Sequence, residues 1–339
     1  MKICVYGAGA IGAYLGAQLA SAGGDVSFVA RGPHLAAMRE HGVRLQIDGE
    51  ERVVKVRCTS NPRELGQQDY VIVALKAHSV PGVVDEIRTL LGPDTAIVTA
   101  VNGIPYWYFY KHGGELEGTT LDSVDPGAKQ WSALGPERAI GCVVYPAAEV
   151  VAPGVIRHVY GKKFPIGEPN GERSDRVQKL HELMSAAGLD APIREQIRDE
   201  IWLKLWGNLC FNPISALTHA TLDVITSNPA TRAVSKAMML EAKAIADRFG
   251  VHFRVDVERR IDGAGAVGAH KTSMLQDLEA NRPMEIDPLL TVVQEMGRLV
   301  GQPTPTIDTV LALIKLRGQV AEHAPRPTER SAPVVETAS

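Results

Sequence analysis

The stretch KICVYGAGAIG, residues 2–12, decides the fold. Residues 2–6 form a short apolar run that ends at a glycine, which is typical of a buried strand. An Ala- and Leu-rich segment with helical spacing follows at residues 10–22, and Gly23-Gly24 ends it. The pattern G-x-G-x-x-G lies between the two, and a strand before it with a helix after it is the context in which this pattern binds a dinucleotide.

Each glycine of this loop has a steric role. The first permits a tight turn out of the strand, the second lets the backbone approach a pyrophosphate, and the third lets the helix pack closely on the strand. The unpaired N–H groups at the start of the helix then face the anion. Ordinary tight turns are the alternative explanation for such glycines. We predict that six consecutive residues bind the cofactor: Gly7, Ala8, Gly9, Ala10, Ile11 and Gly12.

The rest of the first half alternates short apolar runs with helical segments. Strand patterns recur at residues 25–30, 70–75 and 95–101, a short helix is expected at 33–40, and Asp48-Gly49 marks a hairpin. Strands that alternate with helices in units of about 30 residues predict a doubly wound, mostly parallel sheet. The expected fold class is therefore α/β, with a Rossmann-like sheet in the N-terminal domain.

The second half is expected to be an all-helical C-terminal domain. Helical periodicity covers roughly residues 198–211, 229–249 and 288–299. We predict an NADP-binding domain at residues 1–170 and a connecting linker, which begins at a polar hinge, at residues 171–197. A helical substrate domain is expected at residues 198–321 and a disordered tail at residues 322–339.

Composition excludes several classes of protein. The chain has 339 residues, of which 45% are hydrophobic and 22% charged, as in ordinary globular proteins. Lys plus Arg number 36 against 39 Asp plus Glu, so no basic excess favours nucleic acid as a partner. No apolar run is long enough for a membrane helix or a signal peptide. The four cysteines form no C-x-x-C pair and predict no metal site, which favours a reduced, cytoplasmic location.

The end of the second strand selects the cofactor. An NAD site places Asp or Glu there to accept hydrogen bonds from the ribose, whereas this chain reads VARG at residues 29–32. The guanidinium of Arg31 suits a 2′-phosphate, because it is a planar donor with a permanent charge. The alternative is a surface arginine in a turn. We predict NADPH as the cofactor, with Arg31 among its ligands.

Two further strand ends carry polar residues. Lys76 follows the strand at 70–75, and Asn102-Gly103 follows the strand at 95–101. Ligands of doubly wound sheets bind at this carboxyl edge. Ordinary polar strand ends, or a simple turn at Asn102-Gly103, are the alternatives. We predict that Lys76 and Asn102 belong to the cofactor site.

A polar stripe marks the helical half. Lys204, Asn208 and Asn212 are four residues apart and share one helix face, among Trp, Leu, Ile and Phe. Burying such groups without partners is unfavourable, so the stripe either lines a polar cavity or faces solvent. Further along lie SMLQD at 273–277 and EID at 285–287, whose acids taken alone are ordinary charges at a helix start.

Six motifs in this order resemble the ketopantoate reductase (2-dehydropantoate 2-reductase) family. They are the glycine loop, Lys76, Asn102-Gly103, the Lys204/Asn208/Asn212 stripe, SMLQD and EID, and the resemblance covers about residues 1–317. It implies a Rossmann domain followed by a helical domain, and reduction of a 2-oxo acid by NADPH. The most favoured substrate is 2-dehydropantoate, which becomes pantoate in pantothenate and CoA biosynthesis.

The resemblance also implies roles for individual residues. Lys204 is similar to the lysine that gives a proton to the carbonyl oxygen, and Glu285 to the carboxylate that holds the hydroxyl end of the substrate. Ser273, Asn208 and Asn212 resemble substrate-binding residues, and Asn102 resembles the asparagine beside the nicotinamide. A cation beside the developing alkoxide agrees with the needs of ketone reduction.

Three departures from the family affect the substrate rather than the reaction. Leu222 lies in the stretch where known members have a further pocket asparagine, and PLLT at 288–291 replaces a usual Asn-Gly. The aromatic segment at 106–110 either packs between the domains or reshapes the pocket. A same-fold reductase for another 2-oxo or hydroxy acid, and an NADP-binding sensor without turnover, are the alternatives. A homodimer is compatible with these features.

Overall fold

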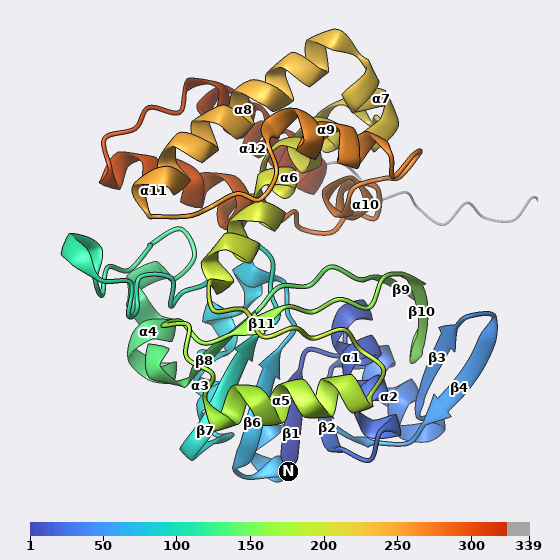
Figure 1. The fold of residues 1–339 in the computed structure, drawn as a ribbon. Helices are drawn as coiled ribbons and strands as arrows, with labels where there is room; N and C mark the ends of the chain where they lie inside the picture. Colours follow the sequence, from blue (N-terminus) through green and yellow to red (C-terminus); the bar gives the residue numbers. More distant parts are fainter. Residues whose placement is uncertain (324–339) are drawn as a thin grey trace, which may run out of the picture.

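The computed structural model describes residues 1–323 of the chain. It has two halves, a sheet-containing half and a helical half, stacked on one another (Figure 1). Helix α6 (Ile197–Thr218) reaches from the first half into the second. The arrangement agrees with the predicted fold class. In the part of the chain that the structure describes, no helix combines the length and the hydropathy needed to cross a membrane.

The main sheet has seven strands in the order β11-β8-β7-β6-β1-β2-β5. All neighbouring pairs are parallel except β11 with β8. The order reverses at β1, so the chain winds outward in both directions and leaves a crevice at the carboxyl ends of β1 and its neighbours. The strands are β1 (Lys2–Tyr6), β2 (Asp25–Val29), β5 (Arg57–Thr59), β6 (Gln68–Val73), β7 (Leu91–Thr99), β8 (Ala139–Cys142) and β11 (Ile166–Gly167).

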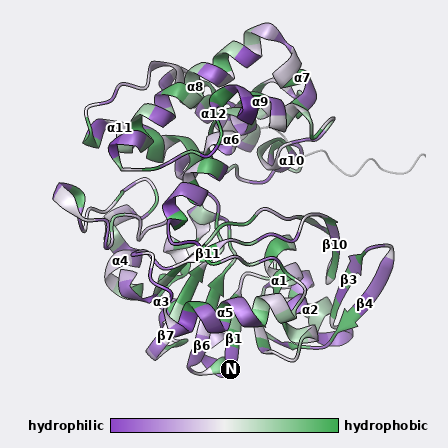
Figure 2. Cartoon of the chain, viewed as in Figure 1, coloured by the Kyte–Doolittle hydropathy of each residue, from purple (hydrophilic) through white to green (hydrophobic). Residues whose placement is uncertain are grey.

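Both faces of this sheet are covered, which explains why its strands are almost continuously apolar. Alternate residues point to opposite faces, so Ile3 and Val5 join the core under α1 (Ala10–Ser21), whereas Cys4 and Tyr6 join the core that continues into the helical half. The second core also takes residues from α3 (Val84–Arg88) and α4 (Lys129–Leu134). In Figure 2 the middle strands of the sheet are green, the colour of hydrophobic residues.

A second sheet of four strands stands beside α1 and α2 (Gly32–His41). Its order is β4-β3-β10-β9, from β3 (Val43–Ile47), β4 (Glu50–Val54), β9 (Ala147–Ala152) and β10 (Val155–Tyr160). The predicted hairpin at Asp48-Gly49 joins β3 to β4, and both residues have the positive φ that such a turn requires. The β9–β10 hairpin was not predicted, although Pro153-Gly154 is its turn.

The predicted linker at 171–197 contains a packed helix. Helix α5 (Asp175–Ala186) begins at Ser174, whose side chain accepts a hydrogen bond from the Val177 backbone. Val177, Leu180 and Met184 are buried against the sheet with helical spacing. The helical spacing of these three residues is present in the sequence, but polar residues surround it and weaken the pattern.

The helical half is built around α6, which contacts most of the other helices. The predicted end of this helix at Phe211 is wrong, because α6 continues through Pro213 to Thr218. Ile214 and Ala216 are buried, and this packing outweighs the hydrogen bond that proline cannot donate. The other helices are α7 (Leu222–Ser227), α8 (Pro229–Arg248), α9 (Val257–Gly265), α10 (Ser273–Glu279), α11 (Val292–Leu299) and α12 (Pro305–His323).

Helix α12 affects the predicted tail at 322–339. Because α12 ends at His323, residues 322 and 323 are helical rather than the start of a tail. The remainder of the predicted tail, residues 324–339, lies outside the described part of the chain.

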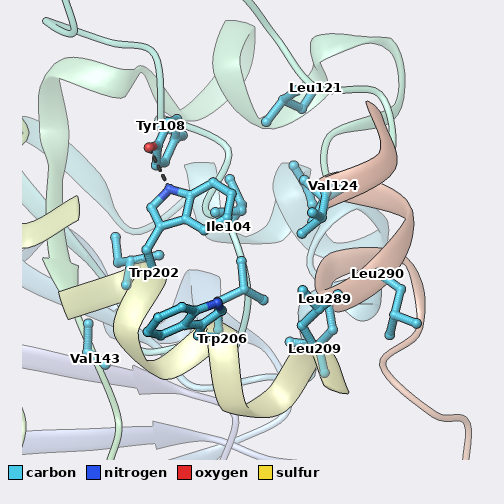
Figure 3. Packing of buried hydrophobic residues seen from close by; sticks show 14 of the residues in the cluster. Ile104, Tyr108, Leu121, Val124, Val143, Trp202, Trp206, Leu209, Leu289 and Leu290 are labelled. Carbon is cyan, nitrogen blue, oxygen red and sulfur yellow. Dashed lines mark hydrogen bonds between the residues drawn. The ribbon is translucent and has the colours of Figure 1, made fainter. Parts of the chain in front are cut away.

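The aromatic segment at 106–110 joins the two halves. The Trp202 indole donates a hydrogen bond of 2.7 Å to the Tyr108 hydroxyl, as Figure 3 shows within the surrounding core. Arg198 donates to the backbone carbonyls of Tyr108 and Tyr110 at 2.9 and 2.7 Å. Residues 106–109 are buried. These contacts support the packing alternative, and the segment fixes the start of α6 on the sheet half.

Candidate active site

A hollow with a volume of about 870 Å³ lies at the carboxyl end of β1. Three parts of the chain line it: the glycine loop after β1, the end of β2 with the start of α2, and the residues after β6. The β9–β10 hairpin adds Val150, Ala152 and Pro153. We call this hollow the nucleotide cleft.

The glycine loop has the geometry that a dinucleotide requires. Gly7 has a φ of +106°, and a Cβ on Gly12 would lie 2.0 Å from the Gly7 carbonyl oxygen, so both positions require glycine. A Cβ on Gly9 would meet nothing within 4 Å, which leaves the loop open toward the cleft. Gly7, Ala8 and Gly9 line the cleft, whereas Ala10, Ile11 and Gly12 form the first turn of α1.

These residues fit a pyrophosphate. The backbone N–H groups at the start of α1 have no acceptors within their own helix, and the helix dipole places positive charge at the same point.

Arg31 follows β2 and lines the cleft. Its side chain is 65% exposed and forms an ion pair of 3.5 Å with Glu86 of α3. No motif marks Glu86, which comes from a helix that follows a different strand. The hairpin residues also carry no motif and are far away in the chain.

His34 of α2 is a further lining residue, and no sequence motif marks it. The Gly154 backbone N–H donates to His34 Nδ1 at 2.9 Å. In the neutral ring the proton is then on Nε2, which is buried close to the backbone of Ala8 in the glycine loop. Burial lowers the pKa of His34, so the neutral form is favoured. His34 thus ties the β9–β10 turn to the wall of the cleft.

A second group of polar side chains lies where the sheet edge meets the helical half. The ammonium of Lys204 donates to Asn102 Oδ1 at 2.7 Å and also to the Val144 carbonyl. The amide of Asn102 donates to Glu285 Oε2 at 3.1 Å, and the Ala77 N–H donates to Glu285 Oε1 at 2.9 Å. Lys204, Asn102 and Glu285 therefore form one hydrogen-bonded chain, which we call the catalytic chain.

The catalytic chain changes the acidity of its lysine. Burial lowers the pKa of Lys204 to about 8, because the charged form loses contact with water, and the nearby carboxylate of Glu285 opposes part of that change. Glu285 is only 5% exposed. An ammonium with such a pKa is still protonated at neutral pH and gives up its proton more readily than an ordinary lysine, which suits it to general acid catalysis.

Lys76 lies at the Glu285 end of this chain. Its ammonium bonds to Asp277 of α10 and is 3.9 Å from Glu285 Oε2, and Lys76 is not among the residues that line the nucleotide cleft. The structure thus places it beside two carboxylates of the helical half, whereas the sequence associated it with the cofactor. Asp277 is part of the SMLQD motif, but no role was predicted for it.

The remaining predicted residues are spread along two helices. Asn212 is buried, and its Nδ2 has no hydrogen-bond partner in the described part of the chain, while Asn208 is half-buried one turn nearer Lys204. Ser273 is exposed at the first turn of α10, where Thr272 caps the helix. The structure therefore joins Lys204, Asn102 and Glu285 directly and leaves Asn212 with a free donor.

The departure at 288–291 is part of the contact between the halves. Residues 287–291 form a π-helical turn, and Leu289 and Leu290 are buried in the core. A Cβ on Gly103 would lie 2.1 Å from the Pro288 carbonyl oxygen, and the Ile104 N–H donates to the same oxygen at 3.4 Å. Only glycine permits this approach next to Asn102.

Comparison with known proteins agrees with this architecture. The model of the ketopantoate reductase PanE/ApbA family matches residues 3–171, and the model of its C-terminal part matches residues 196–318. A curated 2-dehydropantoate 2-reductase of Mesorhizobium japonicum is 60% identical over 93% of this chain and 97% of that protein.

Solved structures share the fold. A structure from Ralstonia solanacearum MolK2, assigned to the ketopantoate reductases, has a TM-score of 0.90 and 44% identity, and the match covers 94% of this chain and 98% of that one. A dimeric ketopantoate reductase from Staphylococcus aureus is 19% identical with a TM-score of 0.71, over 95% of this chain and 100% of that one.

Proposed function

The chain belongs to the ketopantoate reductase family, and we propose that it reduces 2-dehydropantoate to pantoate with NADPH, the step that serves pantothenate and CoA biosynthesis. The observation that carries this proposal is the catalytic chain Lys204–Asn102–Glu285 at the junction of the two halves. It combines a proton donor, a fixed carboxylate and a bridging amide next to a nucleotide cleft.

The cofactor is held by residues of the sheet half. The glycine loop and the start of α1 bind the pyrophosphate, and Arg31 binds the 2′-phosphate. When bound, NADPH supplies the hydride that reduces the ketone. Asn102 lies at the carboxyl edge of the sheet and orients the catalytic groups, because its oxygen accepts from Lys204 while its amide donates to Glu285.

Lys204 supplies the proton. Its ammonium points its hydrogens at Asn102 and the Val144 carbonyl, so it is held in one place before the substrate arrives. With a pKa of about 8, Lys204 is protonated at neutral pH and still gives up its proton more readily than an ordinary lysine. It thereby neutralises the oxygen of the substrate as negative charge develops there.

Glu285 and the helix amides bind the substrate. The carboxylate of Glu285 accepts a hydrogen bond from the hydroxyl end of 2-dehydropantoate. The Ala77 N–H and the Asn102 amide fix the orientation of this carboxylate. The unpartnered Nδ2 of Asn212 supplies a hydrogen-bond donor to the substrate, and Asn208 and Ser273 are the other substrate-binding residues. Lys76 stabilises the carboxylates of Glu285 and Asp277 by charge.

One observation favours a second candidate, the reduction of another 2-oxo acid on the same fold. Leu222, in the stretch where the resemblance implies a further pocket asparagine, is buried at the start of α7 and offers no hydrogen bond from its side chain. A substrate with fewer hydroxyl groups would need no such partner. A sensor without turnover is disfavoured, because binding alone requires no buried proton donor.

Steady-state kinetics separate these candidates. NADPH oxidation is followed with 2-dehydropantoate and with a panel of other 2-oxo acids, both branched and unbranched. We expect the highest kcat/KM for 2-dehydropantoate. A higher value for another 2-oxo acid would support the second candidate, and binding of NADPH without turnover of any 2-oxo acid would support the sensor.

We further propose a homodimer in the cytoplasm. The dimeric relative from Staphylococcus aureus supports the first part, as do three exposed apolar residues on one side of α12, Leu313, Leu316 and Val320. Light scattering of the purified protein at several concentrations tests the dimer. The four cysteines, all reduced and buried, support a reducing compartment.

A further inference from the structure

An acidic residue from another part of the chain lies beside Arg31, where the residues that follow β2 provide none. The residues after β2 contain Arg31 but no Asp or Glu that would accept a hydrogen bond from the ribose of NAD. In the folded chain the carboxylate of Glu86, from α3, lies beside Arg31. Its carboxylate is 3.5 Å from the Arg31 guanidinium, and both residues line the nucleotide cleft.

The carboxylate of Glu86 is anchored. The Tyr6 hydroxyl at the end of β1 donates to Glu86 Oε2, the same oxygen that pairs with Arg31. Tyr6 is buried, and burial together with the neighbouring carboxylate raises the pKa of its phenol, so the hydroxyl remains a donor. Within residues 1–323, Oε1 of Glu86 has no hydrogen-bond partner, and the side chain is 45% exposed.

Arg31 and Glu86 have opposite preferences for the two nicotinamide coenzymes. A guanidinium pairs with the 2′-phosphate of NADPH. A carboxylate accepts hydrogen bonds from the free ribose hydroxyls of NADH and repels a phosphate at the same place. In addition, Glu86 competes with the phosphate for the guanidinium of Arg31.

We propose that Glu86 sets the coenzyme selectivity of this cleft, by accepting the 2′-hydroxyl of NADH and by weakening the attraction of Arg31 for the 2′-phosphate of NADPH. The cleft then binds both coenzymes, with NADPH bound more tightly. This inference rests on the proposed function only in assuming that a nicotinamide coenzyme occupies the cleft.

Direct binding tests the inference without turnover. Dissociation constants of NADPH and NADH are measured by the fluorescence of the reduced nicotinamide, and those of 2′-AMP and 5′-AMP by displacement of NADPH. In Glu86→Gln the shape is kept and the charge is lost. We expect NADPH and 2′-AMP to bind about threefold to tenfold more tightly, and NADH about threefold more weakly.

Asp85 provides a matched control on the same helix. It does not line the cleft, and its carboxylate faces Lys129 and Arg88 instead. Asp85→Asn removes the same charge one residue away, so we expect the ratio of the NADH and NADPH dissociation constants to stay within about twofold of the unaltered protein.

Two results would overturn the inference while leaving the proposed function intact. One is an unchanged ratio in Glu86→Gln, and the other is weaker NADPH binding in that variant, which would mean that Glu86 only holds Arg31 in place. If the unaltered protein bound neither coenzyme, the proposed function would fail together with the inference.

Discussion

The nucleotide cleft and the catalytic chain are built in opposite ways. The floor of the cleft comes from consecutive residues of one loop, where the backbone and the missing side chains of glycine do the binding. The catalytic chain instead joins Lys204, Asn102 and Glu285, which come from α6, the edge of the sheet and the loop after α10. Local sequence therefore determines the first region, and the packing of the two halves determines the second.

Removing the proton donor is expected to have the largest effect. Lys204→Ala should lower kcat by about 10²-fold or more, because general acid catalysis is typically worth that much, with NADPH affinity nearly intact. Single-turnover NADPH oxidation and a cofactor titration measure the two quantities. Lys76→Ala is the comparison variant, since Lys76 pairs with Glu285 and Asp277 from the other side. Near-normal turnover in the first variant with lost turnover in the second would reverse the assignment.

Neutralising Glu285 is expected to change the pH profile. Lys204 must be protonated to act as an acid, so kcat/KM for reduction should be highest below pH about 8 and fall as the pH rises through that value. The carboxylate of Glu285 raises the pKa of Lys204. Glu285→Gln should therefore move this fall to lower pH and reduce kcat/KM about tenfold or more.

The measurement is the dependence of kcat/KM on pH for both proteins, with Asp287→Asn as a control on an exposed acid two residues away, at the start of the π-helical turn. An unchanged alkaline limb of the pH profile in Glu285→Gln would show that Glu285 does not influence Lys204, which would contradict the catalytic chain.

Arg31→Ala should affect the cleft alone. Loss of a charge-assisted hydrogen bond is expected to weaken NADPH binding by about 1–3 kcal/mol and to leave NADH binding nearly unchanged. Titration of each coenzyme checks this. Equal weakening of NADPH and NADH binding would show that Arg31 does not bind the 2′-phosphate.

The smallest expected effect concerns His34. Its ring accepts from Gly154 and keeps a donor on Nε2, and a glutamine side chain offers the same acceptor and donor. His34→Leu should weaken NADPH binding by about threefold to tenfold, and His34→Gln should restore most of the affinity. Two variants with equal affinities would show that the hydrogen bond does not hold the cleft.

The sequence predicted what depends on short-range patterns. The glycine loop, the parallel sheet and the helix that carries Lys204 follow from spacing and residue type, and the family resemblance supplied the reaction. The contacts across the two halves did not follow. Asp277 beside Lys76 and the Val144 carbonyl beside Lys204 depend on how the halves pack, and a backbone carbonyl leaves no mark in a sequence.

Local rules also failed where packing outweighed them. Pro213 usually marks the end of a helix, yet α6 passes through it because the next turn is buried. Glu86 reached the cleft from α3, since neighbouring strands of a parallel sheet bring distant residues to the same edge.

The close approach of Pro288 to Gly103 bears on which inherited changes this enzyme tolerates. Any side chain at position 103 would meet the Pro288 oxygen and wedge the halves apart, and Asn102 is the adjacent residue. We therefore expect a Gly103→Ala allele to be near-null for turnover, because the added methyl group would occupy the place of the Pro288 oxygen. Selection at this codon thus acts on the distance between two backbones rather than on chemistry.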